Sequence, residues 1–147
     1  MSATPSSTAT PSGTPGSTLG STAGNDALSS GLRRTEVQHR TSSIPGRDIV
    51  QVRTEIPVGV ASGWHTHPGE EVGYIVEGTV RMEIAGQEAL LLHAGSGFLI
   101  PPGTPHDAHD LGPGTGVMLS TYLVDPDQPL SSFVDAPPGA DAADTPQ

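Results

Sequence analysis

The sequence predicts an all-β fold, either a sandwich or a barrel, on three observations. Apolar and polar residues alternate with a period of two over short stretches, which is typical of strands with one buried face. Glycine and proline interrupt the chain about every 8–12 residues, as expected for turns between short strands. No stretch combines a helical period with helix caps.

The first predicted strand covers residues 50–56, where Val50 and Val52 alternate with polar residues. Pro45-Gly46 marks the turn before it. His39 lies in the polar stretch that precedes this turn, and we expect it to be an ordinary surface residue.

Residues 72–76 and 80–84 predict a pair of strands joined by a tight turn at Glu77-Gly78. A second turn follows at Ala85-Gly86. Further strands are predicted at the apolar stretches 90–92, 97–100 and 117–124.

The composition predicts one folded domain, residues 31–134, between two tails. Residues 1–30 are dominated by Ser, Thr, Pro and Gly and cannot bury enough apolar surface to offset the entropy of ordering them, so we expect a disordered tail. Residues 135–147 are interpreted as a second, acidic tail. Neither a secretory signal nor a membrane-spanning stretch is recognisable, which favours a cytoplasmic location.

Charge and cysteine content narrow the function classes. The net charge of −10, with six Lys plus Arg, argues against nucleic-acid binding, which requires a basic face. Cysteine is absent, which excludes disulfides and thiolate catalysis. Any metal must therefore be bound through nitrogen and oxygen ligands.

Two histidines and a glutamate form a candidate metal-binding stretch. His65 and His67 are two residues apart, so on a strand both imidazoles leave the same face. Pro68-Gly69 then turns the chain, which lets Glu71 return toward the same point. His106, in a second stretch rich in glycine and proline, is the best candidate for a fourth ligand.

Two spaced motifs resemble those of the cupin superfamily. The first motif asks for Gly, five residues, His-x-His, three or four residues, Glu, six residues and Gly, and is matched at Gly59, His65, His67, Glu71 and Gly78. The second asks for Gly, five residues, Pro-x-Gly, two residues, His, three residues and Asn, and is matched at Gly95, Pro101, Gly103 and His106. Asp110 stands where asparagine is usual. The spacer of sixteen residues resembles that of small microbial single-domain cupins.

The resemblance implies a double-stranded β-helix, or jelly-roll barrel, with one divalent metal ion held by His65, His67, Glu71 and His106. Three neutral imidazoles and one carboxylate would leave about two open positions in a six-coordinate shell. The ligand types allow Fe, Mn, Ni, Co, Cu or Zn, with Fe(II) slightly preferred.

Side chains on the inward faces of the predicted strands are expected to line the substrate pocket or to fill the barrel as plain core. These residues are Val52, Ile75, Met82, Ile84, Phe98, Ile100, Met118 and Tyr122. Tyr74 and Tyr122 are the candidate proton donors. Trp64 and His109 have the wrong parity to face the metal.

Three functions remain open. The likeness to cupins of the quercetin-dioxygenase type implies a metal-dependent dioxygenase acting on a small organic molecule, with Glu71 as its base. A non-redox isomerase, cyclase or lyase would use the ion to polarise a carbonyl or activate water. The third is a non-catalytic module that binds a small molecule. Because an open barrel must cover its edges, we expect a homodimer.

Overall fold

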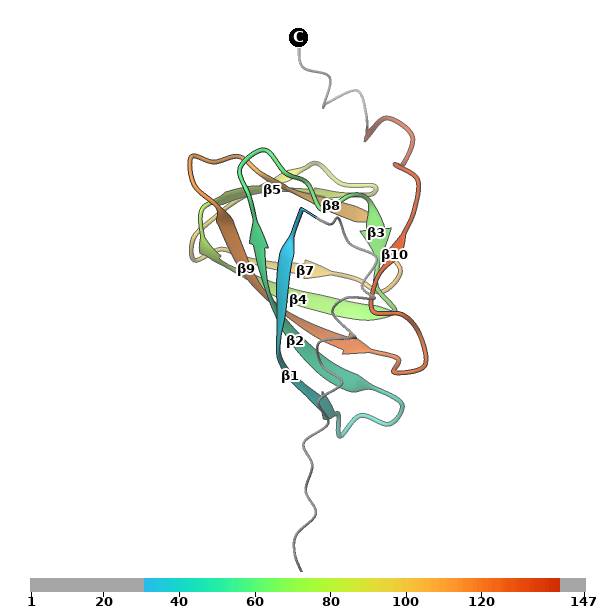
Figure 1. Cartoon of the computed structure of the whole chain (residues 1–147). Coiled ribbons are helices and arrows are strands. Elements are labelled where there is room, and N and C mark those ends of the chain that lie inside the picture. The colour runs from blue at the N-terminus through green and yellow to red at the C-terminus, as the bar shows by residue number, and fades with distance from the viewer. Residues whose placement is uncertain (1–30, 141–147) are drawn as a thin grey trace, which may run out of the picture.

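The computed structural model describes residues 31–140, which fold into two five-stranded antiparallel sheets that face each other (Figure 1). The first sheet has the order β1 (Arg33–Thr41), β2 (Asp48–Ile56), β9 (Gly116–Val124), β4 (Gly69–Glu77) and β7 (Gly97–Ile100). The second has the order β10 (Ser132–Phe133), β3 (His65–Thr66), β8 (His106–Asp110), β5 (Thr79–Ile84) and β6 (Leu90–His93). This confirms the predicted all-β double-stranded barrel.

The strands lie between Arg33 and Phe133, inside the predicted domain of residues 31–134. The tail predicted for residues 1–30, and the part of the second tail at residues 141–147, lie outside the described residues. Residues 31–140 form no helix, so none of the described part of the chain is a helix that could span a bilayer.

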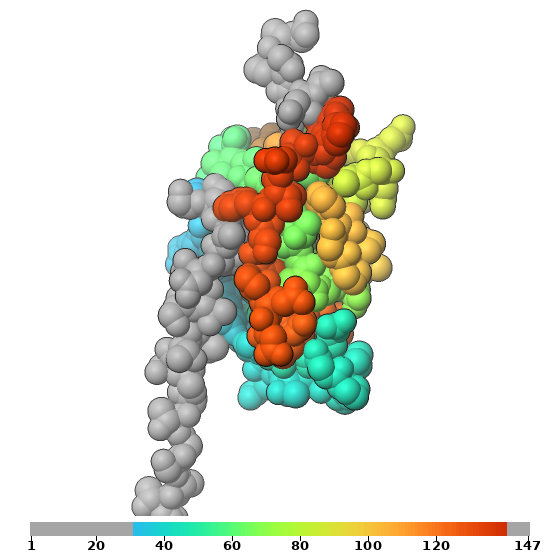
Figure 2. All heavy atoms as spheres, turned by 90° about the vertical axis from the view of Figure 1, so that its right-hand side faces the viewer, coloured from blue at the N-terminus to red at the C-terminus, as the bar shows by residue number. Residues whose placement is uncertain are grey.

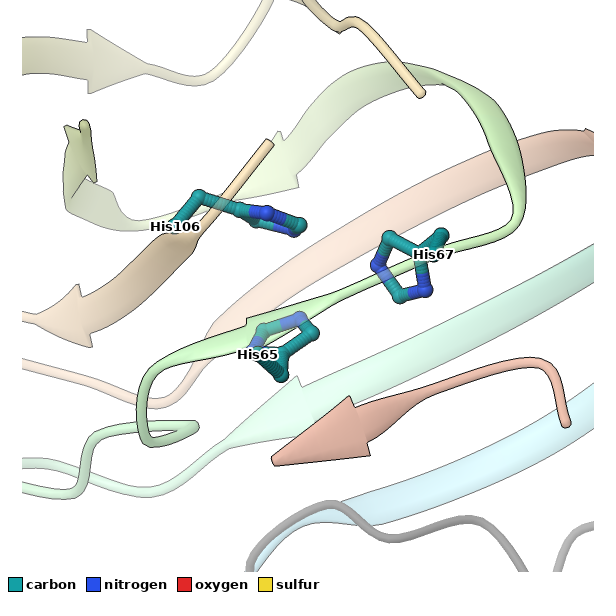
Figure 3. Close-up of side chains that lie close together, drawn as sticks. All are labelled: His65, His67 and His106. Atoms are coloured by element: carbon teal, nitrogen blue, oxygen red, sulfur yellow. The ribbon is translucent and has the colours of Figure 1, made fainter. Parts of the chain in front are cut away.

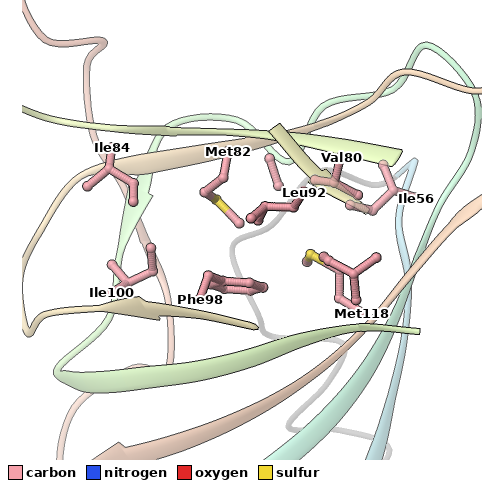
Figure 4. Close-up of a cluster of buried hydrophobic side chains, with 10 residues drawn as sticks. Ile56, Val80, Met82, Ile84, Leu92, Phe98, Ile100 and Met118 are labelled. Carbon is pink, nitrogen blue, oxygen red and sulfur yellow. The ribbon is translucent and has the colours of Figure 1, made fainter. Parts of the chain in front are cut away.

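The main core lies between the two sheets, where apolar side chains from β5 and β6 face those from β7 and β9 (Figure 4). Its buried members are Ile56, Ile75, Val80, Met82, Ile84, Leu92, Phe98, Ile100, Ala108 and Met118. Gly73 faces the Phe98 ring so closely that an added Cβ would overlap it. The absence of a side chain at Gly73 therefore makes room for one of the two phenylalanines of the chain.

A second, smaller core fills the other end of the first sheet. It contains Val50, Val52, Tyr122 and Val124, with Leu130 packed against them. Leu130 belongs to the segment that follows β9 and leads to β10. Figure 2 shows this C-terminal segment, in orange to red, running along one face of the molecule. β10 pairs with β3, so this segment lies against the strand that carries His65.

The sequence did not predict β1. The strand pairs with β2 along its whole length, with an irregularity between Glu36 and Gln38. It lies at the edge of its sheet, and most of its residues are exposed. Its two half-buried positions hold the charged residues Arg34 and Glu36, so the stretch interpreted as polar surface carried no apolar period. His39 lies on this strand, and its Nε2 atom lies 2.6 Å from Asp48 Oδ2.

Candidate metal centre

Three buried imidazoles converge inside the barrel (Figure 3). His65 on β3 pairs across the sheet with His106 on β8, and their ring centroids lie 4.2 Å apart. His67 follows β3, and its ring centroid is 4.9 Å from each of the other two. One ring nitrogen from each histidine lies within 4.8 Å of the others. The cluster is therefore compatible with a single divalent ion.

Backbone carbonyls orient all three rings. The Nδ1 atoms of His65, His67 and His106 lie 2.6, 2.7 and 2.9 Å from the carbonyl oxygens of Gly63, Leu130 and Thr104, respectively. A carbonyl only accepts, so each Nδ1 carries the hydrogen, and in the neutral ring Nε2 keeps its lone pair. Metal-binding histidines commonly donate their second nitrogen in this way.

Burial favours the neutral form of His65. Burial first, and then the neighbouring His106 and His67, lower the pKa of His65 to about 3. A metal needs an unprotonated imidazole, so this ring is already in the form that binds a cation. His67 Nε2 is buried and makes no hydrogen bond within the described residues.

Glu71 on β4 brings a carboxylate to the histidines. Its Oε1 atom lies 3.1 Å from Nε2 of both His67 and His106. Burial alone would raise the pKa of Glu71, but its interactions with His106 and His67 hold this pKa well below its usual value. An ionised oxygen facing lone pairs on neutral rings is repelled unless a proton or a cation lies between them. The arrangement therefore fits a metal ion.

The other oxygen of Glu71 is held by hydroxyl groups on β9. Ser120 Oγ donates to Oε2 over 2.7 Å, and Tyr122 Oη donates to the same atom over 3.3 Å. Burial raises the pKa of Tyr122, and the charge of Glu71 raises it further, so its hydroxyl keeps its proton. Oε1 is left as the oxygen that faces the imidazoles.

The donor set suits a transition metal. Imidazole nitrogens bind Zn, Cu, Fe and Ni, and a carboxylate adds an oxygen ligand that suits Mn. The set has no thiolate, because the chain contains no cysteine. The residues present therefore fit the ion that the sequence analysis expected.

A cavity of about 10 Å³ lies beside this cluster, which is room for about one water molecule. Its lining consists of His65, Glu71 and His106 together with Leu32, Thr54, Ser62, Met82, Ala108, Met118 and Tyr122. Apart from the candidate ligands, its lining therefore consists of apolar and hydroxyl side chains.

All eight residues predicted to line the pocket are buried, but only three of them line this cavity: Met82, Met118 and Tyr122. Ile75, Ile84, Phe98 and Ile100 pack in the main core, and Val52 packs in the smaller one. Which of the eight contact a substrate stays a prediction.

The remaining aromatic and histidine residues that the sequence singled out lie away from the cluster. Tyr74 is half exposed on the outer face of β4, which leaves Tyr122 as the tyrosine near the cluster. Trp64 borders a separate groove beside the turn after β5. His109 points away from the metal cluster, and its Nε2 lies 3.0 Å from Glu83 and 3.1 Å from Asp107.

Leu32, Arg34 and Ser120 lie near the cluster but were not predicted from the sequence. Ser120 lies between Met118 and Tyr122 on the inward face of β9. Alternation along this strand could therefore have predicted an inward hydroxyl beside these two pocket residues. Arg34 Nη2 donates to Tyr122 Oη over 3.1 Å. No apolar period marked Arg34, because it lies on the edge strand β1.

Comparison with known proteins supports the fold and the family. The Cupin domain model matches residues 52–122. No curated protein sequence matches the chain. A protein with a double-stranded β-helix domain from Klebsiella pneumoniae subsp. pneumoniae MGH 78578 is similar at a TM-score of 0.60 and 18% identity, over 78% of this chain and 95% of that one.

Two further solved structures are similar. KdgF from Halomonas sp. has a TM-score of 0.56 and 26% identity, over 66% of this chain and 82% of that one. The DMSP lyase DddQ from Ruegeria pomeroyi DSS-3 has a TM-score of 0.61 and 17% identity, over 76% of this chain and 57% of that one. The region that the Cupin domain model matches, residues 52–122, holds the histidine cluster and most strands of both sheets. The chain therefore belongs to the cupin superfamily.

Proposed function

We propose that this cupin is a metal-dependent enzyme, and that its reaction is the oxygenation of a small organic molecule. His65, His67, His106 and Glu71 would hold one divalent ion, with Fe(II) as the first candidate. The observation that carries the proposal is the convergence of three Nε2 lone pairs, each set by a carbonyl bonded to Nδ1. When bound, a redox-active ion would supply the electrons that let dioxygen react with an organic substrate.

The chain's own residues would orient the ligand carboxylate and exclude water. Ser120 and Tyr122 hold Oε2 of Glu71 and so leave Oε1 for the ion. Met82 and Met118 supply an apolar wall beside the histidines, which keeps bulk water from the reacting atoms. Release of Glu71 Oε1 would give a carboxylate able to take a proton from the substrate, which is the predicted role of Glu71 as a base.

A non-redox isomerase, cyclase or lyase is the second candidate. The observation that favours it is the Tyr122 hydroxyl, which lines the cavity and contacts Glu71. A proton donor beside a carboxylate base is the pair that proton-transfer reactions need. In such a reaction a bound ion would supply polarisation of a carbonyl or activation of water.

The deciding experiment combines metal analysis with oxygen uptake. Protein purified without added metal would be analysed for transition metals and then assayed against a panel of phenols and enols, with His65→Ala as the inactive variant and His39→Ala as a surface control. About one Fe, Mn, Ni or Cu per chain, with oxygen uptake above the level of His65→Ala, supports the oxygenase. Turnover that is equal with Zn and Fe and needs no oxygen supports the second candidate. A metal-loaded protein with neither activity would be a binding module.

A further inference from the structure

The segment that follows β9 lies against the metal cluster. This C-terminal segment, residues 125–134, ends in β10, and β10 pairs with β3 (Figure 1). The Cupin domain model matches residues 52–122, so the segment lies beyond the part of the chain that shows the family. It nevertheless contacts the strand that carries His65.

Two residues of this segment contact the outer ring nitrogen of His67. Its Nδ1 atom lies 2.7 Å from the carbonyl oxygen of Leu130 and 3.2 Å from Ser131 Oγ, and Ser131 is only 2% exposed. In the tautomer with hydrogen on Nε2, two acceptors would face each other over the shorter of these distances. The Leu130 carbonyl therefore selects the tautomer with hydrogen on Nδ1, which leaves the Nε2 lone pair for a metal.

Contacts along the whole segment hold that carbonyl in place. At its start, the Asp125 amide donates to the Pro68 carbonyl over 3.3 Å. In its middle, Leu130 packs against the smaller core. At its end, the Val134 amide donates to the Trp64 carbonyl over 3.0 Å. The acceptor for the imidazole is thus positioned by the docking of the segment as a unit.

We propose that the C-terminal segment is part of the metal centre: Leu130 and Ser131 position His67, and docking of the segment and metal binding strengthen each other. The inference rests on the proposed metal site and deepens it by naming what sets its affinity. A cation on Nε2 would draw electron density from the ring and make the Nδ1–H group a stronger donor. Metal binding therefore favours the docked segment, and by linkage the docked segment raises metal affinity by the same factor.

The first test follows hydrogen exchange of single amides in the full chain by NMR, with and without the diamagnetic ion Zn(II). The reporter is the Val134 amide, whose exchange should slow by at least about 5-fold at saturating Zn(II). The control is the Ser42 amide, which donates to the Arg47 carbonyl over 2.9 Å between β1 and β2 and should exchange at an unchanged rate. Equal slowing at both amides, or at neither, overturns the proposal but leaves the metal site standing.

The second test measures Zn(II) affinity by competition with a coloured chelator. Groups that orient metal ligands contribute about 10- to 100-fold in affinity. Because the Leu130 carbonyl remains, Ser131→Ala should weaken binding by about 10-fold, and the slowing of exchange at Val134 should shrink with it. Ser131→Thr, which keeps a hydroxyl group, should restore both.

The matched control is Ser132→Ala, which removes the same group from an exposed position one residue along the segment. This variant keeps the full affinity for Zn(II), and thermal melting shows that each variant is folded. An unchanged affinity in Ser131→Ala overturns the positioning role of Ser131. Failure of the unaltered protein to bind Zn(II) overturns the metal site, and this proposal with it.

Discussion

Ser120 Oγ donates a hydrogen bond of 2.7 Å to Glu71 Oε2, and the two residues are both buried inside the barrel. β9 and β4 are neighbours in the first sheet, so this bond crosses between adjacent strands. It fixes the carboxylate with its other oxygen toward His67 and His106.

Loss of this hydroxyl is therefore expected to weaken metal binding. Groups that orient metal ligands typically contribute 10- to 100-fold in affinity, so Ser120→Ala should raise the dissociation constant for Co(II) by about that factor. Competition with a coloured chelator measures it. Thr121→Ala is the control, because Thr121 bonds to Gln51 on the other face of the strand. An unchanged dissociation constant in Ser120→Ala would show that Glu71 does not bind the ion through the oxygen assigned here.

Removal of the metal should lower the melting temperature. A ligand present at a thousand times its dissociation constant stabilises the folded state by about 4 kcal/mol, and each kcal/mol moves the midpoint of a domain of this size by roughly 4 °C. Calorimetry before and after treatment with a chelator would show the shift. His65→Ala should show none, while His39→Ala should behave as the unaltered protein does.

Acid should destabilise the metal-free protein through His65. Its pKa is lowered to about 3 in the folded chain, from 6.5 in the unfolded one, first by burial. Between these values the unfolded chain binds a proton that the folded chain does not, so stability falls as the pH falls from 6.5 toward 3. Lowering the pH from 6.5 to 5 should cost about 2 kcal/mol from this residue. Urea unfolding of His65→Asn should show a flatter pH profile, and identical profiles would contradict the assignment.

Replacement of Asp110 is expected to stabilise the folded protein. Its side chain is buried on β8, and neither carboxylate oxygen makes a hydrogen bond within residues 31–140. Burial of a charge without a partner is unfavourable. Asp110→Asn, which restores the usual cupin residue, should raise the free energy of unfolding by about 1–3 kcal/mol. Chemical denaturation measures it, with Asp127→Asn as an exposed control, and a less stable Asp110→Asn would reveal a partner for the carboxylate.

The expected homodimer has a candidate surface on the outer face of β4 and β7. Val72, Tyr74, Val76 and Leu99 are all exposed there, and Val72 pairs with Leu99 across the two strands. β7 is also a sheet edge, where a second copy could add its own strand. Light scattering should give twice the chain mass of 15.0 kDa.

Charge placed on that surface should separate the two copies. Val72→Glu combined with Leu99→Glu should give the mass of one chain, because burying two carboxylates in an apolar contact is costly. Leu91→Glu, on the edge strand β6 of the other sheet, should leave the dimer intact. A single-chain mass for the unaltered protein would contradict the predicted homodimer.

The sequence by itself determined the fold class and the pair of imidazoles at His65 and His67. Both depend on local order: alternation with a period of two, glycine and proline at the turns, and a His-x-His spacing that sends two imidazoles to one face. These features remain readable because each depends on residues a few positions apart.

Tertiary structure alone decided what surrounds the cluster. The bonds to Glu71 from Ser120 and Tyr122 join residues 49 and 51 positions apart, and Arg34 meets Tyr122 across 88 positions. β1 carried no apolar period, because its two half-buried positions are the charged residues Arg34 and Glu36. Its inward face was settled only by pairing with β2, and that pairing is what brings Arg34 to Tyr122.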